Sequence, residues 1–190
     1  MNTEYEAKFL SIDVKKLRET LAACGATRVY PEFLMKRVVF DLPKKVVHGW
    51  ARVRQEADKV TMSVKLFEGE SMLDQKEVEL TIDNFEQGVV FLEALGMIKK
   101  AYQESKRERW NFDGVDVTID TWPGLSTFAE IEGDSEAVVH TASEQLGFDW
   151  SQAVFGAVSV IYERELGIRE HGILDETPMI TFAQPPVARE

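Results

Sequence analysis

The segment EYEAKF, residues 4–9, alternates charged and apolar side chains without interruption. Its charged members are Glu4, Glu6 and Lys8, and an apolar residue follows each of them. Successive side chains of a β-strand point to opposite faces of a sheet, so this pattern predicts a strand with one apolar and one charged face. Burial against a core would require only the apolar face. The charged face is therefore the feature of the sequence that demands an explanation.

The same alternation returns in six later segments, at residues 50–56, 59–67, 76–82, 106–112, 115–120 and 128–133. In one of them Glu108 interrupts the apolar face. Antiparallel sheets accommodate strands that are apolar on one side and polar on the other. The charged side chains that share the polar register are Arg52, Arg54, Lys65, Glu77, Glu79, Arg107, Arg109, Asp116, Asp120, Glu130 and Glu132.

Four helical segments are predicted to cover the apolar face of this sheet, at about 12–24, 84–95, 135–146 and 151–165. Glycines at the ends of the first three are typical of helix termination. Strands and helices in this order indicate an α+β fold. We expect a single domain over residues 1–166, followed by a Pro-containing C-terminal tail over 167–190.

Composition and charge exclude several classes of function. The chain has 190 residues, a formal net charge of −11 and one cysteine. Net negative charge argues against broad electrostatic binding to nucleic acid or to anionic membranes. The sequence has neither an apolar run long enough to cross a bilayer nor a signal-like N-terminus, so we expect a cytoplasmic protein. A single cysteine allows no internal disulfide. A homodimer remains an open alternative.

Two interpretations of the charged faces remain. They could simply meet water, or the sheet could curl so that they converge on a charged interior. We favour convergence, because glutamates and basic residues occupy the same register on separate strands. Clustered carboxylates repel one another unless they bind protons or a hard cation such as Mg²⁺ or Mn²⁺. Clustered arginines and lysines need an anion, and the Arg fork matches phosphate oxygens. Together they predict a pocket for a metal-bound polyphosphate.

The motifs resemble a known family. They are EYEAK at the N-terminus, RVR at 52–54, SVK ending at Lys65, EVE at 77–79, the basic stretch KRER, and TIDTWPGLSTFAEIEG at 118–133. In this order they are similar to the CYTH superfamily, also called the triphosphate tunnel metalloenzymes. This superfamily includes class IV adenylyl cyclases, thiamine triphosphatases and inorganic tripolyphosphatases. The resemblance extends over about residues 3–165.

The resemblance implies a closed eight-stranded antiparallel β-barrel, or tunnel, with a charged interior and helices packed outside. It also implies roles for individual residues. Catalytic roles are implied for Glu4, Glu6, Lys8 and Asp120. Substrate binding is implied for Lys8, Arg52, Arg54, Lys65, Arg107 and Arg109. An acidic wall is implied for Glu77 and Glu79. Metal ligands, for Mg²⁺ or Mn²⁺, are implied for Glu4, Glu6, Glu130 and Glu132.

One position departs from the family pattern. The family has K-x-R in the later basic strand, and Ser105 stands where that lysine belongs. If the strand keeps its register, Arg107 and Arg109 face the interior with Ser105, whereas Lys106 points outward. A β-bulge would reverse this arrangement.

Three functions are compatible with these residues. The first is metal-dependent hydrolysis of a linear or organic triphosphate such as tripolyphosphate or thiamine triphosphate, in which the metal activates water. The second is a class IV adenylyl cyclase, in which the ribose 3′-hydroxyl of ATP replaces water. The third is a protein that binds polyphosphate or nucleotide without turnover. Capture of an anion alone does not require so many carboxylates, which argues against the third function. The first two share the triphosphate site; we favour the first and keep the second as its alternative.

Overall fold

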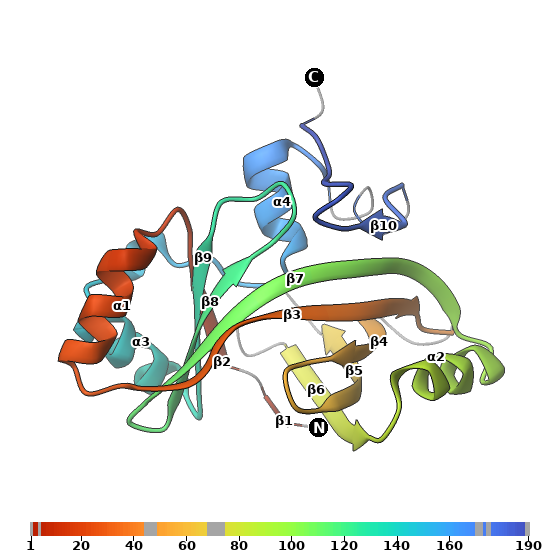
Figure 1. Cartoon of the computed structure of the whole chain (residues 1–190), viewed down its shortest axis with the longest axis horizontal. Coiled ribbons are helices and arrows are strands. Elements are labelled where there is room, and N and C mark those ends of the chain that lie inside the picture. The colour runs from red at the N-terminus through yellow and green to blue at the C-terminus, as the bar shows by residue number, and fades with distance from the viewer. Residues whose placement is uncertain are drawn as a thin grey trace.

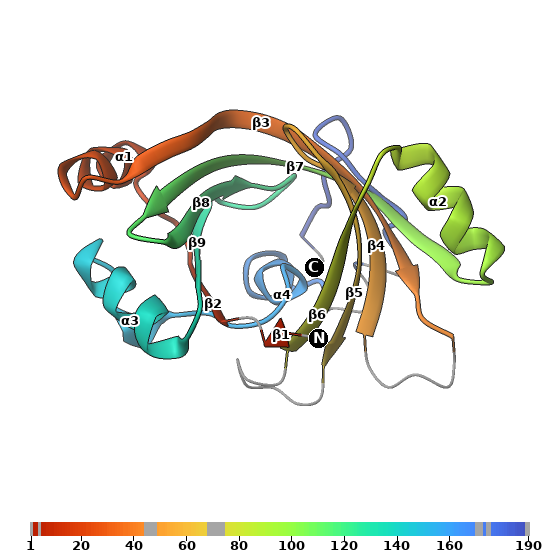
Figure 2. The ribbon, with the colours of Figure 1, turned by 90° about the horizontal axis from the view of Figure 1, so that it is seen from below.

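The structure is a computed structural model that describes residues 2–3, 5–43, 49–67, 75–169, 173 and 176–188. Its centre is one strongly curved sheet of ten described strands (Figures 1 and 2). The path through the sheet runs β1-β6-β5-β4-β3-β7-β8-β9-β2, with β10 paired to β7 beside it. The strands are β1 (Asn2–Thr3), β2 (Tyr5–Phe9), β3 (Thr27–Asp41), β4 (Gly49–Gln55), β5 (Val60–Phe67), β6 (Gln75–Ile82), β7 (Ile98–Phe112), β8 (Val115–Thr121), β9 (Phe128–Gly133) and β10 (Met179–Ile180).

The sheet confirms the predicted α+β class and its antiparallel pairing. Every pair along the path is antiparallel, and only the short pair of β10 with β7 is parallel. The curled sheet resembles an open half-barrel, and complete closure into the predicted barrel is not confirmed. Both ends of the path belong to the N-terminal segment, because β1 pairs with β6 and β2 pairs with β9.

Three helices lie on the outer side of the curve: α1 (Val14–Ala23), α2 (Phe85–Ala94) and α3 (Glu136–Gln145) (Figure 2). Each begins at a side-chain cap, from Asp13, Asn84 and Ser135 respectively, whose oxygen accepts a backbone N–H of the first turn. Each ends before one of the predicted glycines, all of which adopt a left-handed φ of 80° to 84°. These three helical predictions are confirmed.

The fourth predicted helix begins later than expected. Residues Trp150–Gln152 form one turn of 3₁₀ helix, and α4 spans only Ser159–Leu166. Between them Val154 exchanges two backbone hydrogen bonds of 2.9 Å with Lys8 of β2. Because both backbone groups of Val154 are paired with Lys8 in this isolated β-bridge, Val154 cannot also form helical hydrogen bonds. The prediction of a helix from residue 151 was therefore wrong at its start.

The apolar cores lie between the outer face of the sheet and the helices. On one side α1 and α3 cover β2, β8 and β9, with Leu21, Val117 and Ile131 fully buried. On the other side α2 covers β3 to β5 through contacts to Phe40 and Val53. Because strand side chains alternate, burial of these residues outside turns the charged residues toward the inside of the curve. The convergence of the charged faces is thus a consequence of where the helices pack.

A third apolar cluster lies at one end of the curled sheet, where α4 lies across it (Figures 1 and 2). Trp122 and Phe128 meet Tyr162 of α4 there, and the Tyr162 hydroxyl donates to the Pro123 carbonyl oxygen at 2.8 Å. Ile173 and Ile180 from the predicted tail are also buried in this cluster. The domain boundary at residue 166 stays a prediction. No helix within the described ranges is long and apolar enough to cross a membrane.

Candidate functional site

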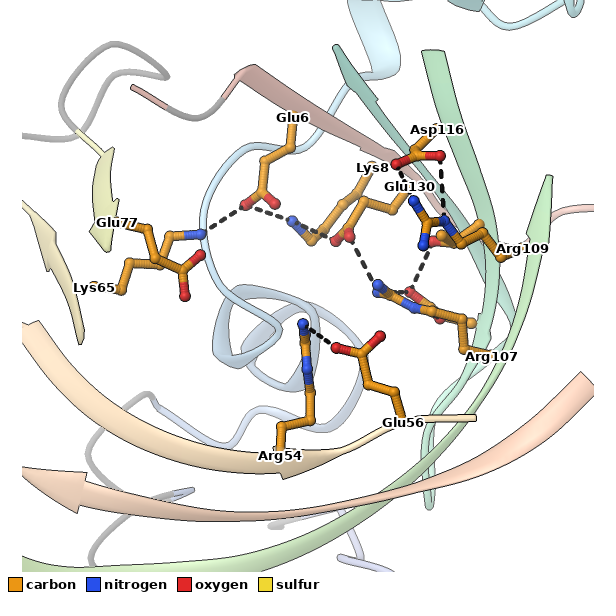
Figure 3. Close-up of polar contacts among 12 residues, drawn as sticks. Glu6, Lys8, Arg54, Glu56, Lys65, Glu77, Arg107, Arg109, Asp116 and Glu130 are labelled. Carbon is orange, nitrogen blue, oxygen red and sulfur yellow. Dashed lines mark hydrogen bonds and ion pairs between the residues drawn. The ribbon is translucent and has the colours of Figure 1, made fainter. Parts of the chain in front are cut away.

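The inside of the curved sheet encloses a cavity of about 750 Å³ (Figure 3). Among the predicted site residues, Glu4 lies outside the described residues. All of the others line this one cavity: Glu6, Lys8, Arg52, Arg54, Lys65, Glu77, Glu79, Arg107, Arg109, Asp120, Glu130 and Glu132. Acidic and basic side chains face it in nearly equal number. An anion with several negative charges would therefore enter most readily together with cations.

Strand β2 places Lys8 at the centre of a buried ion-pair network. Its ammonium Nζ lies 3.0 Å from Glu6 Oε1 and 3.0 Å from Glu130 Oε2, and Lys65 Nζ lies 3.4 Å from the same Glu6 oxygen. Burial by itself would lower the pKa of Lys8, but the charges of Glu130 and Glu6 outweigh burial and raise it. Lys8 therefore remains a cation throughout the physiological pH range.

Arg107 of β7 forms the second network. Its guanidinium donates to both carboxylate oxygens of Asp120, at 2.7 and 2.6 Å, and to Glu130 Oε1 at 3.1 Å (Figure 3). Burial favours neutral forms of both partners, but the two short parallel hydrogen bonds are those of an ionised pair. Burial alone would raise the pKa of Glu130. The positive charges of Lys8 and Arg107 outweigh burial and hold this pKa well below its usual range. Glu130 thus links the Lys8 network to the Arg107 network.

Strand β7 keeps its register through Ser105, Lys106 and Arg107. The pairing with β8 runs without a shift from Lys106 opposite Thr121 to Phe112 opposite Val115. Arg107 and Arg109 accordingly line the cavity, and Arg109 pairs with Asp116 at 2.7 Å. Lys106 points outward, where its Nζ lies 3.4 Å from Glu32. On the other side, Ser105, Lys106 and Arg107 pair with β3 without a shift, and the nearest irregularity of that pair lies between Tyr30 and Phe33 of β3. This is the orientation that the alternation predicted.

The opposite wall is built on strands β4, β5 and β6. Arg52 lies 3.1 Å from Glu77 and 3.6 Å from Glu79, and its Nε donates to Ser63 Oγ at 3.1 Å. The cross-strand register explains these contacts, since Arg52 faces Ser63 of β5 and Ser63 faces Glu79 of β6. Arg54 continues the row, 3.3 Å from Glu79.

Four charged residues that line the cavity were not predicted: Arg37, Glu56, Lys59 and Asp134. Glu56 lies 2.6 Å from Arg54 Nη2, and Arg37 of β3 reaches into the cavity opposite Arg54. The signal for Glu56 was present, because it continues the alternation of Arg52 and Arg54 by one step. Arg37 gave no such signal, because its inward neighbours along the strand are Met35 and Val39.

Glu132 is the acidic residue best suited to bind a cation. Among the described residues it makes no ion pair, and its accessible surface borders the cavity. Although Glu132 keeps accessible surface, the surrounding protein displaces part of its solvent, and this desolvation together with the nearby charges of Glu130 and Glu6 raises its pKa to about 7. Mutual repulsion of this kind is relieved by a bound cation or a proton. Carboxylate oxygens suit a hard divalent ion such as Mg²⁺ or Mn²⁺.

In their present arrangement the described residues do not form a complete set of ligands for a metal ion. No group of three or more acidic, histidine or cysteine side chains among those residues is arranged to hold a metal. Glu6 and Glu130 are bound to Lys8 and to other cations of the cavity. The chemistry of the donors thus fits a divalent cation, although Glu6 and Glu130 would have to exchange their present partners.

Fold and cavity together define a class of protein in which a curled antiparallel sheet surrounds a charged interior site and helices pack against the outer face of the sheet. The chain belongs to the CYTH family, since the model of the CYTH domain matches residues 2–147. Proteins of this family typically act on triphosphates and use divalent metals. A comparison with curated protein sequences gives no match.

Solved structures share this fold at low sequence identity. A protein from Vibrio parahaemolyticus described as a "putative adenylate cyclase" superposes with a TM-score of 0.71 at 14% identity, over 85% of this chain and 98% of that one. A conserved hypothetical protein from Pyrococcus furiosus gives 0.66 at 23% identity, over 80% and 94%. A "putative adenylyl cyclase" from Hippeastrum, described as having a dominant triphosphatase activity, gives 0.52 at 14%, over 85% and 95%.

Proposed function

We propose that the chain is a divalent-metal-dependent enzyme that hydrolyses a linear or organic triphosphate. The observation that supports this most directly is the single cavity in which basic residues from β2, β4, β5 and β7 face a group of glutamates. Phosphoryl transfer requires little from the protein beyond positioning and charge stabilisation, and such a cavity supplies both. The family supports a triphosphate as substrate without identifying which one.

In this proposal the basic residues bind the phosphate oxygens. Arg52, Arg54, Lys65 and Arg107 present donors from opposite walls, and Lys8 lies between them. Without ligand each of these cations is paired with a carboxylate, for example Arg52 with Glu77 and Arg107 with Asp120. Phosphate oxygens would replace some of these carboxylates as partners, so binding is an exchange of ion pairs. This exchange leaves the bound triphosphate oriented by donors on several strands.

The carboxylates released by this exchange, Glu6 and Glu130, would hold the cation together with Glu132, which makes no ion pair among the described residues. Glu6, Glu130 and Glu132, together with Glu4, are the proposed ligands for Mg²⁺ or Mn²⁺. The ion, when bound, neutralises charge on the phosphate oxygens and activates a water molecule. Asp120 is the proposed positioning residue for Arg107, since it makes two hydrogen bonds with that guanidinium. We further propose that the N-terminal segment, which borders both edges of the sheet, completes a tunnel around the substrate.

One experiment separates hydrolysis from its alternatives. The purified chain is incubated with tripolyphosphate, thiamine triphosphate or ATP, each with Mg²⁺, Mn²⁺ or excess chelator, and the products are separated. Metal-dependent release of orthophosphate supports the proposal. Formation of cyclic AMP and pyrophosphate from ATP would instead identify an adenylyl cyclase. Binding of a triphosphate without product would identify a binding protein.

A matched pair of variants ties any activity to the cavity. Arg107→Ala removes a cation that faces the cavity, whereas Lys106→Ala removes its outward-facing neighbour on the same strand. We expect a large loss of kcat/KM in the first and little change in the second. Equal losses would mean that the activity does not reside in this cavity.

A further inference from the structure

Arg37 is a cation of the cavity that no part of the proposed mechanism uses. It lies near the middle of β3, directly opposite Arg54 on β4 and Gln103 on β7. Like charges placed opposite each other on neighbouring strands destabilise a sheet. Its position therefore costs the protein stability unless something else compensates for it.

Within the part of the chain that the structure describes, the contacts of Arg37 do not include a carboxylate. Its Nε donates to the Gln103 side-chain oxygen at 2.8 Å, and its guanidinium carbon lies 4.1 Å from the centre of the Trp122 ring. Every other Lys or Arg that lines the cavity has an ion pair, so Arg37 is the exception among the residues that the structure describes. A guanidinium carries five N–H donors, and Gln103 accepts only one of them.

The surroundings of Arg37 are strongly positive. Burial lowers its pKa, and the neighbouring charges of Arg52, Arg54 and Arg107 lower it further. Those three arginines have acidic partners, whereas the described partners of Arg37 are a neutral amide and an aromatic ring. An anion next to Arg37 would relieve the repulsion and would occupy the donors that remain.

Apolar residues line the cavity beside Arg37. Trp122 and Phe128, which line the cavity, belong to the cluster formed with Tyr162 of α4 and with Ile173. Apolar side chains cannot solvate further phosphate groups beyond this point. This apolar lining therefore favours the end of a phosphate chain, rather than its middle, beside Arg37.

We propose that Arg37, oriented by Gln103 and Trp122, forms an anion subsite that binds a terminal phosphate group of the substrate. This inference rests on the proposed function, because the ligand is a triphosphate bound in the same cavity. It adds a specificity-determining residue that holds one end of the triphosphate against the apolar cluster.

The test uses Arg37→Gln and a matched control, Arg28→Gln. Arg28 lies on the same strand and also lies over a tryptophan ring, that of Trp110, but it is exposed and does not line the cavity. Binding of tripolyphosphate and of orthophosphate is measured by titration calorimetry on the whole chain. Loss of hydrogen bonds to a charged group weakens binding roughly tenfold to hundredfold, which we expect for Arg37→Gln. Arg28→Gln should stay within about twofold of the wild type.

A second readout distinguishes a ligand-binding role from a structural one. Without ligand, Arg37→Gln should be at least as stable to heat as the wild type, because it removes a repelled charge. Arg37→Lys keeps the positive charge but loses the planar guanidinium, so this variant should bind tripolyphosphate with intermediate affinity. Unchanged affinity of Arg37→Gln for both anions, or a loss of affinity no larger than that of Arg28→Gln, would overturn the subsite.

The subsite and the reaction can fail separately. If the wild type binds tripolyphosphate without turnover and Arg37→Gln weakens that binding, the subsite stands and the proposed hydrolysis falls. If turnover is present and Arg37→Gln binds and reacts like the wild type, the hydrolysis stands and the subsite falls. If the wild type binds neither tripolyphosphate nor orthophosphate, both are refuted.

Discussion

Removal of the Arg107 side chain tests how the charged interior is stabilised in the absence of ligand. The side chains of Arg107, Asp120 and Glu130 are only 17%, 1% and 11% exposed. Arg107→Ala would leave Asp120 as a buried carboxylate with its main partner gone. Breaking a buried ion pair by removal of one partner costs about 3–5 kcal/mol. For a chain of this size we expect the melting temperature to fall by about 6–20 °C.

The assay is urea and thermal unfolding in metal-free buffer, monitored by tryptophan fluorescence. Lys106→Ala is the control, because its side chain is 43% exposed and its ion pair with Glu32 lies on the surface. Surface pairs of this kind contribute about 0–1 kcal/mol. The double variant Arg107→Ala/Asp120→Asn removes the stranded charge and should recover part of the loss. The single variant should also regain stability, relative to the wild type, as pH falls and Asp120 becomes protonated.

Two results would refute this reasoning. A cost for Arg107→Ala no larger than that of Lys106→Ala would mean that Asp120 is not held as a buried anion. Absence of any recovery in the double variant would mean that the loss comes from packing of the Arg107 stem rather than from an uncompensated charge.

Three further predictions concern other parts of the chain. Because the pKa of Glu132 is raised to about 7 in the folded state, the free energy of unfolding without metal should fall as pH rises from about 4.5 to about 7. Glu132→Gln should remove that fall, measured by urea titrations at a series of pH values. A pH profile that is the same in the variant and the wild type would contradict the raised pKa. Arg52→Ala should weaken binding of tripolyphosphate by about 1.5–3 kcal/mol, measured by calorimetry, whereas an effect within about 0.5 kcal/mol is what an open solvent face would give. Gly88→Ala would place its Cβ 2.5 Å from the terminal Ile82 Cδ1 and 3.1 Å from Cγ1 of the fully buried Val53. Overpacking of about 1–3 kcal/mol should exceed the gain of about 1 kcal/mol from Ala in a helix, so we expect a net loss in thermal unfolding; full stability would show that Ile82 or α2 moves aside.

Much of the candidate site was predictable because a strand has a strict period of two. Once Ala7 and Phe9 are assigned to the apolar side, Glu6 and Lys8 must face the other way, and the same holds for Arg107 between Lys106 and Glu108. The pattern therefore determined which side of each strand its charges occupy. The glycine after each of the first three helices likewise determined where those helices end, because only a left-handed residue closes the turn at low cost.

Tertiary structure alone decided which charges meet. Lys8 contacts Glu130, and Lys65 contacts Glu6, because strands distant in sequence are brought together by the curl of the sheet, and no local pattern encodes that distance. Arg37 was missed for the same reason, since its inward neighbours along β3 are apolar and its charge is recognised only beside Arg54 across the strand pair. The late start of α4 also depends on a remote contact, the pairing of Val154 with Lys8. Local sequence sets the direction in which a side chain points. Its partners are set by the long-range pairing of strands, because the backbone N–H and C=O groups of each strand must be satisfied by hydrogen bonds.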